Sequence, residues 1–256
     1  MPILINGIQT MEIINKSLKR RIIEISYRNK LSHLGSCLTA VGLINEIYGK
    51  KKDQDIFILS SGHAGLALYV VLEKYYQIDA SMLFDKHGVH PNRDIENHIW
   101  ASSGSLGHGL GIAVGAAISN KDRRVYCLIS DGEFAEGSIY ESLNIAKRLE
   151  LRNLTVYINC NGFGAYSRIY EYQICTHTNL YSKLYINVRK TYFDLPFLDG
   201  QDAHYYTMNE DDYKLAMQIY APTRKPEGIL RVLPTPGNER EQRNISNMRR
   251  FGVQSF

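Results

Sequence analysis

The sequence predicts an α/β fold in which a mostly parallel sheet carries helices on both faces. Two short apolar runs rich in β-branched residues, Val125 to Ile129 and Leu154 to Ile158, each end in turn residues and therefore indicate buried strands. Between them, Ser138 to Leu149 carries apolar residues at helical spacing. Together these segments predict a βαβ unit, with a right-handed crossover and two parallel neighbouring strands.

The alternation of strands and helices also runs along the chain before this unit. A helix is predicted over Met11 to Arg28 because its apolar residues share one face, and Thr39 to Tyr48 continues as helix. A short strand from Asp55 to Leu59 is followed by a helix from Ala64 to Tyr76.

The next segment is predicted to be irregular. Ser81 to Trp100 has little periodicity and is rich in His, Asn and Gly, so we expect an active-site loop there. Leu106 to Ile118 is predicted to be a helix, with Gly107, Gly111 and Gly115 on one side. Small residues on one side of a helix let another backbone approach closely, so we expect a tight contact there.

Length and charge limit the classes of protein. With 256 residues, the chain can bury the core of one large α/β domain. Positions 221–256 hold an excess of Lys and Arg equal to the formal net charge of +4. We therefore expect a domain over residues 1–235 and a basic tail over residues 236–256, solvated or packed on a partner. No aromatic residues interleave with the tail arginines, so a nucleic-acid partner is not expected.

No hydrophobic run reaches the roughly twenty residues that a membrane span needs. Met1 to Arg21 also lacks the order of regions in a signal peptide. The four cysteines show neither a CxxC pair nor metal-ligand spacing, which favours reduced thiols. A cytoplasmic protein without a membrane partner is the expectation.

Asp131 and Asn161 follow the two strands of the βαβ unit. Neighbouring parallel strands lie about 4.8 Å apart, so both residues should emerge close together at the carboxyl edge of the sheet. One carboxylate and one amide oxygen suit a hard cation such as Mg²⁺. The alternative interpretation is two ordinary turn residues, because Asp and Asn are common after strands.

Several motifs extend this interpretation through a family resemblance. Ser130-Asp131-Gly132-Glu133, then a helix and Asn159-Cys160-Asn161-Gly162, resemble the thiamine-diphosphate motif, in which an Asp and an Asn hold the metal on the cofactor's diphosphate. Four further blocks resemble, in order, the histidine and glycine motifs of transketolase: Ser32-His33-Leu34-Gly35-Ser36, Ile58-Leu59-Ser60-Ser61-Gly62-His63-Ala64, His90-Pro91 and Ala101-Ser102-Ser103-Gly104-Ser105-Leu106-Gly107-His108-Gly109. The resemblance covers positions 30–165 and is poor beyond Pro236.

The resemblance implies the diphosphate-binding domain of the thiamine-diphosphate fold. Tyr192 to Leu198, Gly200-Gln201-Asp202 and Gly228 to Leu233 resemble the strand, the Gly-x-Asp turn and the last strand that close this domain.

The implied cofactors are thiamine diphosphate and Mg²⁺, or Ca²⁺ or Mn²⁺ in its place. The implied metal ligands are the side chains of Asp131 and Asn161 and the main-chain carbonyl of Phe163. The implied cofactor-binding set consists of these three with His63, Gly104, Leu106, Gly132 and Glu133. His63 stands at a strand-to-helix turn, where its ring and the helix amides could meet a diphosphate, although it could also only cap the helix.

By resemblance, His33 and His90 contact the substrate and are the candidate catalytic residues. An imidazole can polarise a carbonyl and move a proton. Glu136 resembles an acidic residue of the subunit interface and could equally cap the helix that starts near Ser138. The residues depart from the family at two points: Leu233 to Phe256 contains no His, and Asn159 replaces an Asp.

The resemblance implies transfer of a two-carbon ketol unit between sugars or sugar phosphates. It also implies a separate partner chain that carries the pyrimidine-binding and C-terminal domains, with two copies of each chain around a two-fold axis. The alternatives are another thiamine-diphosphate enzyme, of the deoxyxylulose-phosphate synthase or 2-oxo acid dehydrogenase type, and an inactive cofactor-binding subunit that regulates or scaffolds a partner.

Overall fold

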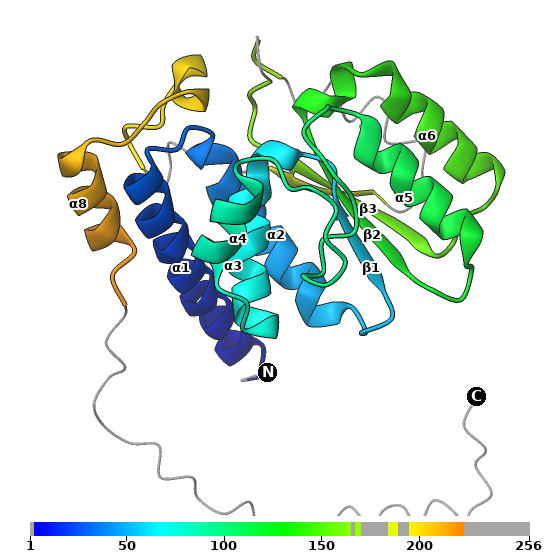
Figure 1. Cartoon of the computed structure of the whole chain (residues 1–256), viewed down its shortest axis with the longest axis horizontal. Coiled ribbons are helices and arrows are strands. Elements are labelled where there is room, and N and C mark those ends of the chain that lie inside the picture. Colours follow the sequence, from blue (N-terminus) through cyan, green and yellow to red (C-terminus); the bar gives the residue numbers. More distant parts are fainter. Residues whose placement is uncertain (1–2, 165–166, 170–183, 189–194, 223–256) are drawn as a thin grey trace, which may run out of the picture. The chain divides into compact units, whose positions relative to one another are not determined.

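The computed structural model describes residues 3–164, 167–169, 184–188 and 195–222. Its centre is a parallel sheet of four strands in the order β1 (Ile56–Leu59), β2 (Val125–Ser130), β3 (Leu154–Cys160) and β4 (Leu184–Val188) (Figure 1). All three strand pairs are parallel, so the predicted βαβ unit is confirmed.

Helices cover both faces of the sheet, as predicted (Figure 1). Residues that alternate along a strand face opposite sides. Phe57 and Leu59 therefore belong to one hydrophobic core, and Ile56 and Ile58 to the other. The first core includes α1 (Ile3–Asn29), α2 (Leu34–Lys50), α3 (Gly65–Tyr76) and α4 (Ala80–His87), and the second includes α5 (His108–Ser119) and α6 (Gly137–Arg148).

The structure corrects the segment that the sequence predicted as a loop from Ser81 to Trp100. Its first part is helix α4, whose N-cap is Asp79, because the Asp79 carboxylate accepts from the Met82 N–H at 2.9 Å. Leu83 anchors the helix because it is completely buried. Irregular chain follows only from Gly88 to Gly107.

The expected strand from Tyr192 to Leu198 is wrong over residues 195–198, which form a turn, and residues 192–194 lie outside the described part. The fourth strand is instead β4, and a further helix, α8 (Glu210–Ile219), begins with an Asn209 capping box. The expected last strand, Gly228 to Leu233, and the tail 236–256 lie outside the described residues.

Of the three glycines expected in a tight contact, Gly107 lies in one, against the side chains of Ser138 and Glu136, and a close approach to another backbone occurs at Gly109. A Cβ on Gly109 would lie 2.5 Å from the Ser60 Cα, whereas one on Gly115 would have no atom of another described element within 4 Å. The side of α5 with Gly111 and Gly115 is exposed in this chain, together with Ile112. None of the described helices is long and apolar enough to cross a membrane.

Candidate active site at the carboxyl edge of the sheet

Two loops meet where β2 and β3 end, through direct contacts of Asp131. One oxygen of its carboxylate accepts from the Gly162 N–H at 2.7 Å, and the other accepts from the Gly132 N–H at 3.0 Å. Asn161 is buried, and its side-chain oxygen accepts from the Phe163 N–H at 3.0 Å. The structure thus brings the loops that carry the predicted metal ligands together.

Gly132 makes a second link between these loops. A Cβ at this position would lie 3.2 Å from the Gly164 Cα, so the two backbones nearly touch. Phe163 forms an isolated antiparallel bridge with Arg168, which fixes the course of the second loop beyond Asn161. The narrow gap explains why a glycine suits position 132.

The Asp131 side chain suits a divalent cation. The residue is 1% exposed and, within the described residues, no basic side chain forms an ion pair with it. Burial raises the pKa of this carboxyl to about 7, against the hydrogen bonds from Gly162 and Gly132. A buried carboxylate is costly without a positive partner. A carboxylate has more lone-pair positions than these N–H donors use, so Asp131 and the Asn161 amide fit a hard metal ion.

The carboxylate of Glu133, the next acidic residue, accepts hydrogen bonds from other residues of this chain. One carboxylate oxygen accepts from the Ser60 hydroxyl and from the Gly107 N–H at 2.9 Å, and the other accepts from the Ser130 N–H at 2.8 Å. The residue is 0% exposed. Glu133 therefore joins the ends of β1 and β2 to the start of α5, and direct contact with a cofactor stays a prediction.

The three predicted site histidines gather beside this edge together with a fourth, His204, which the sequence does not single out. The ring centroid of His33 lies 5.8 Å from that of His63, 6.5 Å from that of His90 and 4.4 Å from that of His204. They come from the α1–α2 turn, the turn after β1, the loop after α4 and the segment before α8. The structure thus unites residues that are far apart in the sequence.

His204 is the site residue that sequence reasoning missed. It follows the Gly200-Gln201-Asp202 turn, which the sequence indicates only as a closing element of the domain. Its carbonyl accepts from the His33 N–H at 2.9 Å, and its ring lies 5.8 Å from the His63 ring. The sequence has no His after Leu233, but His204 gives the cluster a fourth ring.

His33, His63 and His204 favour the neutral form of the imidazole. Burial and the neighbouring rings lower the pKa of His33 to about 4 and that of His63 to about 3, and burial lowers the pKa of His204. No group of three or more His, Cys, Asp or Glu in the described chain could hold a metal ion. The neutral rings can donate and accept hydrogen bonds.

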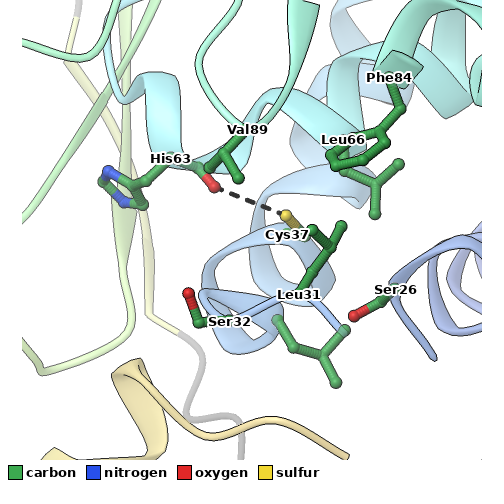
Figure 2. A pocket seen from close by; sticks show the side chains of 9 residues that line it. Ser26, Leu31, Ser32, Cys37, His63, Leu66, Phe84 and Val89 are labelled. Atoms are coloured by element: carbon green, nitrogen blue, oxygen red, sulfur yellow. Dashed lines mark hydrogen bonds between the residues drawn. The ribbon is translucent and has the colours of Figure 1, made fainter. Parts of the chain in front are cut away.

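A small pocket lies beside the turn that carries His63 and is lined partly by Ser26, Ser32, Cys37 and Leu66 (Figure 2). The Cys37 thiol donates to the His63 carbonyl at 3.7 Å, and the ring of His63 points away from this thiol (Figure 2). Burial raises the pKa of Cys37 to about 12, so the thiol stays protonated. Cys37 serves to hold the turn.

Gly104 lies against His90. A Cβ on Gly104 would be 3.2 Å from the His90 ring, and the φ of this residue, 138°, is one that other residues rarely adopt. Leu106, two residues later, is half-buried. Gly104 thus allows the loop to place His90 close to the predicted cofactor-binding stretch.

Buried polar atoms without a partner mark the same region. Among the described residues, three of the buried side-chain atoms without a hydrogen-bond partner belong here, namely the hydroxyls of Ser61 and Ser103 and the side-chain oxygen of Asn159. Ser61 precedes the His63 turn, Ser103 precedes Gly104, and the Asn159 amide group donates to the Thr39 hydroxyl at 2.9 Å. Buried polar groups normally have partners, so these atoms fit a polar ligand at this edge.

Other candidate residues have simpler surroundings. Glu136 is half-buried and lies next to Gly107, because a Cβ on that glycine would be 2.8 Å from the Glu136 Cβ. His108 is exposed at the start of α5. His87 contacts the Asp94 carboxylate at 3.0 Å, and His98 stacks on Tyr76, so both have contacts of a structural kind.

The fold defines a class, the thiamine-diphosphate-binding fold of transketolases. Transketolase from Leishmania mexicana superposes with a TM-score of 0.57 at 17% identity, covering 82% of this chain and 44% of that one. A transketolase mutant from Pichia stipitis gives 0.62 at 16% identity, covering 94% and 45%. At such identities the similarity establishes the fold alone.

Sequence comparison identifies the family. The family model described as 1-deoxy-D-xylulose-5-phosphate synthase, for its N-terminal part, matches residues 7–195. The chain belongs to this transketolase-like family, so the predicted resemblance is confirmed.

Curated relatives are longer than the matched part. A subunit of apulose-4-phosphate transketolase from Phocaeicola vulgatus is 31% identical over 174 residues, which are 60% of this chain and 62% of the relative. Transketolase-like protein 2 of Mus musculus is 38% identical over 124 residues, 44% of this chain and 20% of the relative. The chain thus spans less than two thirds of each of these two relatives.

Proposed function

We propose that this chain is the diphosphate-binding subunit of a thiamine-diphosphate- and Mg²⁺-dependent transferase that moves a two-carbon ketol unit between sugars or sugar phosphates. The observation that carries the proposal is the joining of the Asp131 and Asn161 loops at the carboxyl edge of the sheet, through the contact of Asp131 with Gly162. In open α/β sheets, ligands bind at this edge.

In this proposal, Mg²⁺ is held by the Asp131 carboxylate, the Asn161 amide oxygen and the main-chain carbonyl of Phe163; Ca²⁺ or Mn²⁺ could take its place. Thiamine diphosphate, when bound, supplies the nucleophilic carbon for cleavage and formation of the C–C bond. His63 and the amides of its turn bind the diphosphate. Gly104 and Leu106 support the aminopyrimidine.

His33 and His90 act on the substrate. Because the lowered pKa of His33 leaves its ring neutral near pH 7, the ring can exchange hydrogen bonds with a carbonyl or hydroxyl without an attached charge. The proximity of His204 to His33 and His63 supports its addition to the site. Gly132 allows the two loops to meet, and Glu133 holds the ends of the strands together through Ser60.

A separate partner chain is the second part of the proposal. Two relatives are named as single subunits of a transketolase, and the chain covers 62% of one and 59% of the other. Ile112 and Ile118 of α5 are 45% and 44% exposed, and apolar surface of this kind favours association. We propose a partner with the pyrimidine-binding and C-terminal domains, Glu136 at the interface, and two copies of each chain around a two-fold axis.

A second reaction type is favoured by the family name. 1-Deoxy-D-xylulose-5-phosphate synthase is the description of the matching family, so a 2-oxo acid is the rival donor to a ketose. The inactive scaffold is the remaining alternative. The relatives named as transketolase subunits favour the ketose.

Calorimetry of the purified chain tests the cofactor site. Thiamine diphosphate should bind with Mg²⁺ and only weakly after chelation, because the diphosphate charge needs a bridging cation. Asp131→Ala should remove most of the affinity, whereas Asp122→Ala, at an exposed loop position, should not. Equal affinity of the wild type and Asp131→Ala would overturn the site.

Assays of the chain with its cognate partner test the reaction. His33→Ala and His90→Ala should keep the affinity for the cofactor and lower turnover by about 10²–10⁴-fold, as is typical of acid–base groups. His63→Ala should weaken cofactor binding instead. Turnover of a 2-oxo acid but not of ketoses would favour the rival donor, and inactivity with both donors would favour the scaffold.

A further inference from the structure

The hydroxyl of Ser32 lies against the ring of His33. Its Oγ is 2.7 Å from His33 Nδ1, a short distance for a hydrogen bond between a hydroxyl and an imidazole. Within the described residues, the Ser32 hydroxyl has no second hydrogen-bond partner, and neither has His33 Nε2. Ser32 and His33 therefore share one hydrogen bond, and Nε2 of His33 has no hydrogen-bond partner among the described residues.

The backbone around this pair is held firmly. His33 has φ 63° and ψ 17°, a left-handed conformation that is uncommon outside glycine, and its N–H donates to the His204 carbonyl at 2.9 Å. Although His33 is the N-cap of α2, its side chain does not cap the helix. Strained residues of this kind persist where the surroundings enforce them, often at functional sites.

A neutral imidazole has one donor and one acceptor nitrogen, and its neighbours decide which is which. No carboxylate pairs with His33 in the described part of the chain, and its ring neighbours are His63, His90, His204 and Tyr205. Among the described residues, the Ser32 hydroxyl is therefore the group that can set the proton position of this ring.

We propose that Ser32 is a positioning residue that donates its hydroxyl hydrogen to Nδ1 of His33 and so keeps the ring proton on Nε2. In the reverse arrangement, Nδ1–H would donate to Ser32, and the hydroxyl hydrogen would have no acceptor within the described residues. Donation by Ser32 pairs the hydroxyl hydrogen with Nδ1 and leaves the Nε2–H as the one donor of the pair that a substrate oxygen can meet.

The consequence concerns the role of His33 and rests on the proposed function. With the proton on Nε2, the free edge of the ring is a hydrogen-bond donor. It suits a carbonyl or alkoxide oxygen of a bound substrate, and it cannot accept a proton from a substrate hydroxyl at that nitrogen. His33 is then a donor to substrate oxygen rather than a general base.

Nitrogen-15 NMR of the full chain, labelled at the histidine rings, tests the tautomer at neutral pH, with His33→Gln as the assignment variant. In the wild type, Nδ1 of His33 should give the signal of an unprotonated nitrogen and Nε2 that of a protonated one. In Ser32→Ala, the fraction with the proton on Nδ1 should rise roughly five- to tenfold, the effect of one ordinary hydrogen bond.

Ser32→Thr retains a hydroxyl and should restore the wild-type signals. Ser17→Ala is the matched control, because it removes a hydroxyl that donates to the Ile14 carbonyl on α1. A proton on Nδ1 in the wild type, or an unchanged tautomer in folded Ser32→Ala, would overturn the proposal. If Ser32→Ala does not fold, the wild-type signals decide.

These measurements need neither cofactor nor partner, so they are separate from the proposed function. An enzyme that fails to transfer ketol units could still have the Nε2–H tautomer, and an active enzyme with the proton on Nδ1 would refute the role of Ser32 alone.

Discussion

Glu133→Gln should destabilise the chain although it keeps the size and shape of the side chain. The two oxygens of this completely buried carboxylate accept from the Gly107 N–H on one side and the Ser130 N–H on the other. An amide accepts hydrogen bonds only at its oxygen, so in the variant an NH₂ group must face one of these two donors.

The magnitude follows from that conflict. Serine hydroxyls such as that of Ser60 can rotate and accept from the new NH₂ group, but a backbone N–H cannot change its role. One buried N–H therefore loses its acceptor, which costs about 1–3 kcal/mol. Removing a buried charge recovers part of this, so we expect a net loss near the lower end, about 1–2 kcal/mol.

Urea unfolding of the isolated chain measures this loss. Glu136→Gln is the matched control, because the same chemical change occurs three residues later at a half-buried position. That variant should remain within about 0.5 kcal/mol of the wild type. A Glu133→Gln chain as stable as the wild type, or more stable, would refute the proposal that Glu133 joins the ends of β1 and β2 to the start of α5.

Three further outcomes are expected. Gly109→Ala should lower the free energy of unfolding by about 1–3 kcal/mol, because its Cβ would meet the Ser60 backbone at 2.5 Å. Gly115→Ala, in open space, should stabilise α5 by up to about 1 kcal/mol. Thermal unfolding should therefore find Gly109→Ala less stable than Gly115→Ala. Burial lowers the pKa of His63 from its ordinary value of 6.5 to about 3. The stability that this neutral ring allows above pH 6.5 is therefore lost as the pH falls toward 3. The free energy of unfolding, measured at several pH values, should depend less on pH in His63→Gln. Ile112→Asp should weaken association with the partner about tenfold or more, while Ile13→Asp, at a similarly exposed position of α1, should not; equal dissociation constants in sedimentation would contradict the interface.

The sequence predicted the elements with strong periodicity well. The predicted strands Val125 to Ile129 and Leu154 to Ile158 differ from β2 and β3 by one or two residues at their ends. Helix α4 was missed because eight residues provide little more than two turns of pattern, although Asp79 is a recognisable N-cap. Strand β4 was missed because its five residues are too few for their pattern to distinguish them from the nearby apolar segment Tyr192 to Leu198.

The candidate site was predictable in part. The strand ends placed Asp131 and Asn161 at one edge of the sheet, because parallel neighbours end together. His204 could not be found in this way, since its place beside His33 depends on the return of the chain from β4 toward α8. The enclosure of Glu133 likewise depends on three loops, which no local pattern reveals.

The irregular stretch 88–107 is attached to the turn after β1 at two glycines. A Cβ on Gly62 would lie 2.5 Å from the Gly104 nitrogen, and one on Gly65 would lie 2.4 Å from the Val89 oxygen. At both points the backbone of the stretch 88–107 therefore packs directly on the backbone that follows β1. Exposed side chains between these points, such as that of Arg93, take no part in the two contacts. The entropy of ordering this stretch is lost when the chain folds, so a ligand that arrives later does not bear that cost. Sequence change at the exposed positions can thus alter what the loop offers to a ligand without altering its path.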